Sequence, residues 1–66
     1  MRNTVRIERQ KREMTEQELA KILSVSPQTI MAIEARRFIP STKLSLKLAA
    51  VLGCNIQDLF ILEEGD

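Results

Sequence analysis

Residues 14–37 read MTEQELAKILSVSPQTIMAIEARR and contain two short helical signals separated by a tight turn. The first signal begins at Thr15, a residue type whose side-chain oxygen caps helix N-termini. Glu18 follows three residues later and completes a capping box, in which the two side chains satisfy each other's backbone N–H groups. We therefore predict a helix over residues 15–23.

The second signal begins at Ser26, another capping residue. Pro27 follows at the first helical position, where the missing N–H of proline costs nothing, and this pattern predicts a helix over residues 26–35. The residues between the two signals are too few for anything but a sharp turn. Residues 15–35 are therefore the predicted helix-turn-helix core, an arrangement whose second helix can enter the major groove of DNA.

The rest of the chain shows further signals on both sides of this core. The predicted elements are a helix over 5–13 capped by Asn3 or Thr4, a helix over 42–52 between the cap Ser41 and the stop Gly53, a helix over 56–59 capped by Asn55, and an apolar run at 60–62. Periodic apolar positions define two inward faces, which are Leu19, Ala20, Ile22 and Leu23, and Leu44, Leu48, Val51 and Leu52. The predicted fold class is all-α with five helices.

The apolar run at residues 60–62 is too hydrophobic for a free tail and too short for a helix of its own. Its β propensity predicts a short strand, which could pair with residues 1–4 in a small two-stranded sheet. The alternative is a patch that is buried between subunits. Residues 1–4 could also be a frayed end.

The length of 66 residues allows one domain, over 1–66, with a small core. A chain of this size buries only about 60% of its unfolded surface, so oligomerisation is a common source of added stability. With one cysteine and no histidine, a single chain holds no internal disulfide and no zinc site, and we expect no metal and no cofactor. The cysteine, Cys54, is expected to be a small buried or turn residue. No apolar run is long enough to span a membrane, so a cytoplasmic location is expected.

The charges are unevenly distributed, although the formal net charge is only +1. Residues 1–47 contain all ten Lys and Arg and five acidic residues, whereas residues 48–66 contain four acidic residues and no basic one. This asymmetry suggests a basic face for an anionic partner and an acidic tail held away from it. Ordinary solvated charge is the alternative.

The helix over 26–35 has two different faces when it is drawn at 100° per residue. Ile30 and Ile33 point inward. The outward side chains are small, slim and nearly uncharged, and they belong to Gln28, Met31, Ala32 and Ala35. Glutamine can pair with N6 and N7 of adenine, and apolar groups, including the methyl group of threonine, can contact the thymine methyl group. The predicted base-contacting residues, which would face A·T pairs, are Gln28, Thr29, Met31 and Ala32.

Phosphate contacts are predicted on the flanks of the two core helices. Helix N-termini offer free N–H groups and the positive end of the helix dipole, and basic side chains follow the second helix. The predicted backbone-contacting residues are Gln17, Ser26, Pro27, Arg36, Arg37 and Lys43. Arg36 and Arg37 could instead stabilise the negative end of the helix dipole, because they lie at the C-terminal end of the helix. This alternative does not exclude contact with DNA.

A pattern of spaced residues runs through the whole chain. It reads R-x5-[TS]-x3-LA-x4-V[ST]xxTIxxIE and is formed by Arg9, Thr15, Leu19, Ala20, Val25, Ser26, Thr29, Ile30, Ile33 and Glu34, followed by Pro40, Ser41, Leu52, Gly53, Ile56, Leu59 and Phe60. This pattern resembles the Xre family, the Cro/C1-type helix-turn-helix repressors, and is most similar to its short, single-domain members.

The resemblance implies a five-helix domain with an added two-stranded sheet from the chain ends and a homodimer that binds an operator. It also implies an ion pair between Arg9 and Glu34, worth about 3–5 kcal/mol if it is buried and about 0–1 kcal/mol if it is solvated. The expected dimerisation region is 54–63, with its interface at Phe60, Ile61 and Leu62.

Four positions depart from the pattern of the family. Glu16 replaces a common glutamine and would repel a phosphate, so Gln17 is expected to take over that contact. Ser24 and Arg36 stand where glycine is usual. A left-handed serine costs about 1 kcal/mol more than glycine, which leaves open how the turn closes. Pro27 replaces a frequent arginine or polar residue and removes one possible contact with DNA.

Together these inferences favour a sequence-specific double-stranded DNA-binding transcriptional regulator, a repressor that binds a near-palindromic operator as a homodimer with the helix over 26–35 in the major groove. The alternative is a protein-interaction module on the same fold, such as an antitoxin or partner-binding subunit, which the acidic tail and modest net charge would suit. An enzyme is not expected, because the chain has no histidine, no paired nucleophile and base, and no glycine-rich phosphate loop. No small-molecule ligand is evident.

Overall fold

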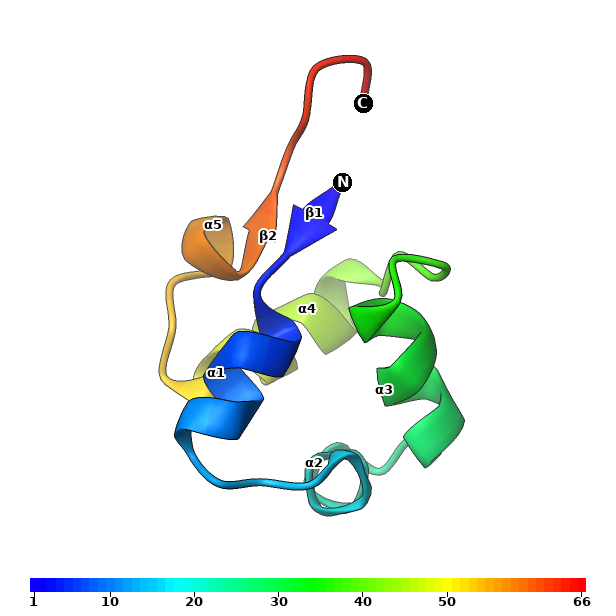
Figure 1. Cartoon of the computed structure of the whole chain (residues 1–66), viewed down its shortest axis with the longest axis vertical. Coiled ribbons are helices and arrows are strands. Elements are labelled where there is room, and N and C mark those ends of the chain that lie inside the picture. The colour runs from blue at the N-terminus through cyan, green and yellow to red at the C-terminus, as the bar shows by residue number, and fades with distance from the viewer.

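Five helices surround one core, and a two-stranded sheet joins the two ends of the chain (Figure 1). The computed structural model describes all residues 1–66. The elements are β1 (Arg2–Asn3), α1 (Val5–Lys11), α2 (Glu16–Leu23), α3 (Pro27–Glu34), α4 (Thr42–Leu52), α5 (Ile56–Leu59) and β2 (Phe60–Ile61). The predicted five-helix fold is confirmed, with α2 and α3 forming the helix-turn-helix.

The helix starts follow the capping signals. Glu18 N–H donates to Thr15 Oγ1 at 3.0 Å, and Thr15 N–H donates to Glu18 Oε1 at 2.9 Å, so the predicted capping box is present. Ser26 and Ser41 each accept a hydrogen bond from the third residue that follows. Asn55 occupies the cap position of α5, but its side chain makes no capping hydrogen bond. The caps therefore fix where α2, α3 and α4 begin.

Four helices end in the same backbone motif, in which one residue takes a left-handed conformation. These residues are Glu13, Ser24, Arg36 and Gly53, with φ values of 54°, 57°, 64° and 65°. In each case the next N–H bonds back to a carbonyl five residues earlier, as in a Schellman motif. The turn between α2 and α3 therefore closes in the left-handed conformation even though it has Ser24 in place of glycine. The same motif ends α1 at Lys11, so the prediction of a helix to residue 13 was wrong.

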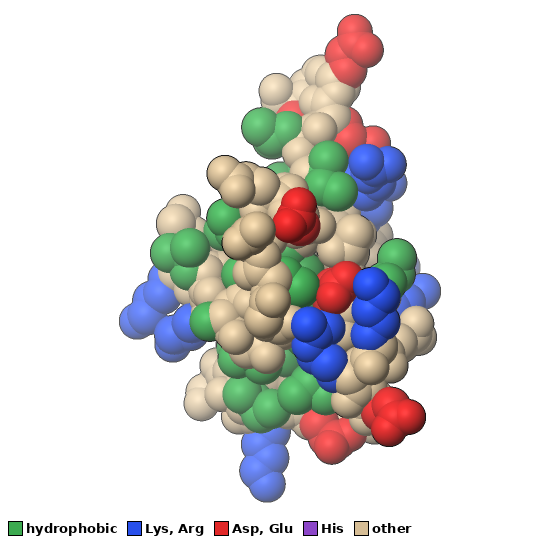
Figure 2. All heavy atoms as spheres, turned by 90° about the vertical axis from the view of Figure 1, so that its left-hand side faces the viewer, with side chains coloured by type: hydrophobic (Ala, Val, Ile, Leu, Met, Phe, Trp, Pro, Cys, Tyr) green, Lys and Arg blue, Asp and Glu red, His purple; other side chains and the backbone are tan.

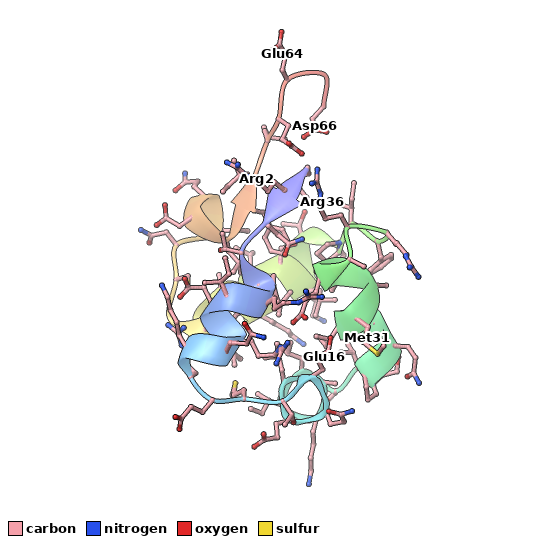
Figure 3. The ribbon with its side chains drawn as sticks, viewed as in Figure 1. Arg2, Glu16, Met31, Arg36, Glu64 and Asp66 are labelled. Carbon is pink, nitrogen blue, oxygen red and sulfur yellow. The ribbon has the colours of Figure 1, made fainter.

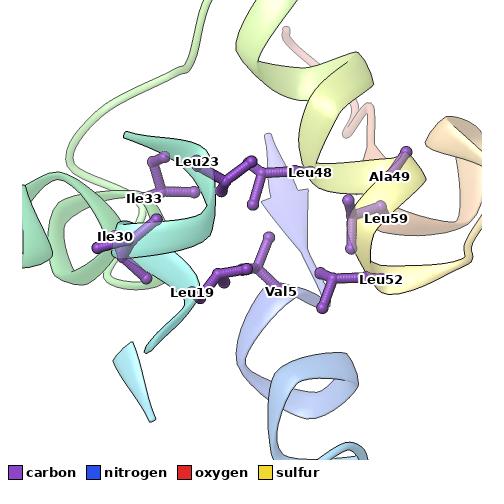
Figure 4. Close-up of a cluster of buried hydrophobic side chains, with 10 residues drawn as sticks. Val5, Leu19, Leu23, Ile30, Ile33, Leu48, Ala49, Leu52 and Leu59 are labelled. Carbon is purple, nitrogen blue, oxygen red and sulfur yellow. The ribbon is translucent and has the colours of Figure 1, made fainter. Parts of the chain in front are cut away.

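The core lies between α2 and α3 on one side and α1, α4 and α5 on the other (Figure 4). Its largest fully buried side chains are Val5, Leu19, Ile30, Ile33, Leu48, Leu52 and Leu59. The inward position predicted for Ile22 was wrong, because this side chain is 54% exposed. Leu19 and Leu23, four residues apart, already fill the buried stripe of α2, and Ile22 lies at its edge.

The two chain ends pair in an antiparallel sheet, with Arg2 opposite Ile61 and Asn3 opposite Phe60. The strand at the C-terminal end therefore forms within one chain, although Leu62 is not part of it. Asn3 Nδ2 also donates to the carbonyl oxygen of Ile33 at 2.9 Å, and Asn3 Oδ1 accepts from Val5 N–H. Asn3 thus connects the sheet, the start of α1 and the end of α3, which helps to position α3.

None of the helices is long and apolar enough to cross a membrane. No group of three or more His, Cys, Asp and Glu side chains is arranged to hold a metal ion.

Candidate nucleic-acid interface

Helix α3 presents one face to the core and another to solvent. Ile30 and Ile33 are fully buried against the other helices. Gln28 and Ala35 are exposed, Met31 is half-exposed and Ala32 is partly buried. The structure therefore places the predicted outward residues on the free side of α3.

A shallow recess of about 390 Å³ lies along this free side of α3. Its lining residues are Arg6, Glu16, Gln28, Met31, Ala32, Ala35 and Arg37. Figure 3 shows that Glu16 extends from the start of α2 towards Met31 on α3. The α3 side of the recess is therefore uncharged, which suits contact with base edges, whereas its walls carry two arginines and one acidic residue.

Thr29 is placed differently from its predicted neighbours. It is partly buried, and its Oγ1 lies 3.0 Å from Ser26 Oγ, within hydrogen-bond distance. Its hydroxyl group is therefore engaged inside the first turn of α3, and Thr29 does not line the recess. Any base contact of Thr29 would be through its methyl group.

The residues predicted to contact the DNA backbone are spread around the ends of α2, α3 and α4. Exposed side chains belong to Gln17, Ser26, Arg36, Arg37 and Lys43, whereas Pro27 is partly buried. Of these residues, only Arg37 lines the recess beside the free face of α3. Ser26 and Lys43 lie near helix N-termini, where backbone N–H groups point outward.

Arg36 is exposed but engaged with the acidic tail. It pairs with Glu63 through Nη2, and its Nε donates to the carbonyl oxygen of Met1 at 3.3 Å. The prediction that the acidic tail is held away from the basic surface was therefore wrong at this point. The sheet between the chain ends explains the contact, because it places the tail beside the N-terminus, and the Arg36 side chain contacts both.

Arg9 and Glu34 form a two-pronged ion pair between α1 and α3. Arg9 Nε donates to Glu34 Oε2 at 2.7 Å, and Arg9 Nη2 donates to Oε1 at 3.1 Å. The side chain of Glu34 is 0% exposed and that of Arg9 is 10% exposed. Arg9 Nη1 also donates to the carbonyl oxygen of Met14 at 2.8 Å. One arginine therefore joins α1, the loop before α2 and α3.

The Arg9 charge sets the protonation of Glu34. Burial alone would raise the pKa of the Glu34 carboxyl, but the hydrogen bonds and charge of Arg9, helped by Arg6, outweigh burial and hold that pKa below its usual range. Hydrogen bonding to Glu34 also raises the pKa of Arg9. The pair is therefore fully charged at neutral pH.

Two charged residues of the recess were not assigned a role from the sequence. Arg6 is 61% exposed and lies 3.4 Å from Glu34 Oε1, a carboxylate that Arg9 already binds. For Glu16, the sequence predicted repulsion of a phosphate but not a position in the recess beside α3. The helical spacing of Arg6 and Arg9, three residues apart, could have indicated that both face α3.

The residues predicted for the dimer interface differ in exposure. Phe60 and Ile61 are partly buried within their own chain, and Phe60 packs against the core. Leu62 is 77% exposed. Cys54, in the same region, is partly buried, and its thiol donates to the carbonyl oxygen of Leu52 at 3.4 Å. Burial and the neighbouring Glu8 raise the pKa of the Cys54 thiol, which favours its protonated form.

The face opposite α3, over α1 and α5, has a different character. Figure 2 shows basic, acidic and hydrophobic side chains intermixed on this face, with acidic groups along the tail at its top. It offers no extended surface of one charge. The recess along α3 is therefore the better candidate for a polyanion.

Comparison with known proteins gives a consistent result. The sequence model of a helix-turn-helix family matches residues 5–59. An HTH-type transcriptional regulator of Methanocaldococcus jannaschii, MJ0272, is 42% identical over 66 residues, which is all of both chains. One from Archaeoglobus fulgidus is 41% identical over 97% of this chain and 90% of its own. YgzD of Bacillus subtilis, also an HTH-type transcriptional regulator, is 33% identical over 97% of both chains.

Proposed function

Because the chain belongs to the Cro/C1-type (Xre) family of helix-turn-helix DNA-binding transcriptional regulators, a class without enzymatic activity, we propose that it is a repressor that binds a near-palindromic operator as a homodimer. In this proposal α3 enters the major groove. Two copies of α3 would lie about 34 Å apart, one turn of DNA. The observation that carries the proposal is the slim, uncharged face of α3, which lines a recess whose charged walls are Arg6, Arg37 and Glu16.

The base contacts are assigned to the free face of α3. The side-chain amide of Gln28 is exposed at the first turn of α3, where it can reach N6 and N7 of adenine. Met31 and Ala32 line the same recess and offer apolar contacts to a thymine methyl group. The Thr29 methyl group adds a weaker contact of the same kind. We therefore expect A·T pairs at the positions of each half-site that face Gln28 and Met31.

The affinity is assigned to the flanks. Arg36, Arg37 and Lys43 would neutralise phosphates, and the N–H groups around Gln17, Ser26 and Pro27 would contribute at the starts of α2 and α3. Because α3 itself has no lysine or arginine, the charged contacts and the base contacts come from different residues. Substitutions in the two groups should therefore have separable effects.

The dimer is assigned to the region 54–63. Leu62 is the most exposed large apolar side chain of the molecule, and it directly follows the partly buried Phe60 and Ile61. Covering these side chains by a second copy would extend the small core of 66 residues. The solution mass of the wild-type chain and of Leu62→Glu, with Leu46→Glu as a control at another exposed leucine, tests this assignment. A monomeric wild-type chain would contradict it.

The experiment that tests the function is binding-site selection from random duplex DNA with the purified chain. We expect a near-palindromic sequence, and Gln28→Ala should lose about 1–3 kcal/mol of discrimination at one base pair of each half-site. Gln10→Ala, at an exposed glutamine of α1 outside the recess, is the matched control and should keep the wild-type preference. An unchanged preference with Gln28→Ala would show that the assignment is wrong.

A salt titration separates this proposal from a protein-interaction module on the same fold. A DNA-binding protein loses affinity steeply as salt increases, because each neutralised phosphate releases counterions. Failure to bind any duplex at low salt would favour the interaction module.

A further inference from the structure

The acidic segment after β2, residues 62–66, extends beyond the sheet and away from the body of the molecule, and its last residue bends back towards Met1 (Figure 3). Its Glu63 carboxylate accepts a hydrogen bond from Arg36 Nη2. The Nε group of the same arginine donates to the carbonyl oxygen of Met1 at 3.3 Å. Two of the donor groups of Arg36 are therefore directed at the ends of its own chain.

The tail holds Glu63 in place through a local turn. Glu63 N–H donates to Asp66 Oδ2 at 2.7 Å, and Asp66 N–H donates to the carbonyl oxygen of Glu63 at 3.0 Å. Asp66 Oδ1 in turn accepts from the amino group of Met1 at 3.0 Å. Glu63 is thus held beside Arg36 by a hydrogen-bonded turn that is joined to the start of the chain. Glu64, by contrast, points away from the body and forms no ion pair.

Carboxylate and phosphate groups bind a guanidinium group in the same way, through charged hydrogen bonds to its planar donors. Arg36 lies two residues after the end of α3, and its neighbour Arg37 lines the recess along α3. The Glu63 carboxylate therefore occupies a donor group of Arg36 that could otherwise bind a phosphate of DNA along α3.

We infer that Glu63 is an intramolecular competitor of the DNA backbone for Arg36, so that the acidic tail lowers the affinity of the free protein for DNA. This inference rests on the proposed DNA-binding function and on the contact assigned there to Arg36. The competition is mild, because the side chains of Arg36 and Glu63 are 51% and 40% exposed and DNA can displace the tail. Its effect is greatest at low ionic strength, where exposed charges are least screened.

The test measures binding of the full chain to a fluorescently labelled mixed-sequence duplex by anisotropy at several salt concentrations. Glu63→Gln removes the competing charge and keeps the size of the side chain. Glu64→Gln makes the same change of net charge at a neighbouring residue without the contact. We expect Glu63→Gln to bind about two- to fivefold more tightly than Glu64→Gln at low salt, the range that an exposed ion pair supports.

The double variants identify the group for which Glu63 competes. In an Arg36→Gln background, Glu63→Gln and Glu64→Gln should have equal affinities, because no guanidinium group remains to be released. Equal affinities of the two single variants, with DNA still bound, would overturn the competition while leaving the proposed function intact. A difference that persists in the Arg36→Gln background would also overturn it. Absence of binding by every variant, including the wild type, would instead contradict the proposed function.

Discussion

Two arginine–glutamate pairs meet the C-terminal end of α3, and they differ mainly in their exposure to solvent. Glu34 pairs with Arg9 in the interior, with 0% and 10% of the two side chains exposed. Arg36, two residues further along, pairs with Glu63 at the surface, where about half of each side chain is accessible. The chemistry of the two pairs is the same, so burial decides what each pair can do.

The buried pair is fixed by its surroundings. Arg9 donates three hydrogen bonds, two to Glu34 of α3 and one to the loop before α2. Water and ions can compete for the surface pair at little cost. We infer that the first pair holds α3 in position, whereas the second pair can exchange its carboxylate for a phosphate.

The largest effect is expected when the buried pair is broken. Glu34→Gln leaves the Arg9 charge without a partner inside the protein, so the free energy of unfolding should fall by about 3–5 kcal/mol. Urea denaturation followed by circular dichroism measures this change. Arg6→Gln is the control, since Arg6 contacts the same carboxylate from a position that is 61% exposed, and it should cost only about 0–1 kcal/mol. Equal losses of unfolding free energy in the two variants would show that burial does not set the strength of these ion pairs.

The same comparison predicts a dependence on pH. The folded-state pKa of Glu34 is lowered, so its contribution to stability is fully present above the unfolded carboxyl pKa of about 4.3 and is lost as the pH falls through the lowered folded value. The stability of the wild type should therefore decrease more steeply below pH 4.3 than that of Glu34→Gln. Thermal unfolding of the two proteins across this range measures the difference. Parallel curves would show that Glu34 is not the titrating group.

Most of the fold was predictable because its signals are local. The caps at Thr15, Ser26 and Ser41 and the stop at Gly53 involve residues close in sequence, and they fixed the boundaries of α2, α3 and α4 to within one residue. The end of α1 was not predictable in this way. Glu13 adopts a left-handed conformation, which is uncommon for glutamate, so its residue type gives no signal for the end of the helix.

The candidate site was only partly predictable, because its walls come from distant segments. The free face of α3 follows from helical periodicity, which predicted that Gln28 and Met31 point outward, and both are exposed. The positions of Arg6 and Glu16 beside that face depend on how α1 and α2 pack on α3. The contact between Arg36 and Glu63 depends on the pairing of the two chain ends. Charge asymmetry along the sequence gave no indication of this contact.

A smaller effect is expected from the strained turn of the helix-turn-helix. Ser24 has φ 57° at the end of α2, where glycine is free of the clash between Cβ and the backbone. Ser24→Gly should therefore raise the free energy of unfolding by about 1 kcal/mol. Gly53→Ala, at the equivalent position after α4 with φ 65°, is the reciprocal control and should lower it by a similar amount. If Ser24→Gly were less stable than the wild type, the serine side chain would stabilise the fold by more than the backbone strain destabilises it.

The smallest effect is expected at the surface pair, and Ser24→Gly supplies its reference. Arg36→Gly relieves the same kind of strain at φ 64° but also removes the pair with Glu63. Arg36→Gly should therefore raise the free energy of unfolding by less than Ser24→Gly does. The difference should be about 0–1 kcal/mol, which is the usual contribution of an exposed ion pair. Urea denaturation at low and high salt measures this difference, which should disappear at high salt as the pair is screened. A difference of several kcal/mol, or one that persists at high salt, would mean that the pair of Arg36 and Glu63 is a structural element like the pair of Arg9 and Glu34. Arg36 could then not exchange Glu63 for a phosphate of DNA.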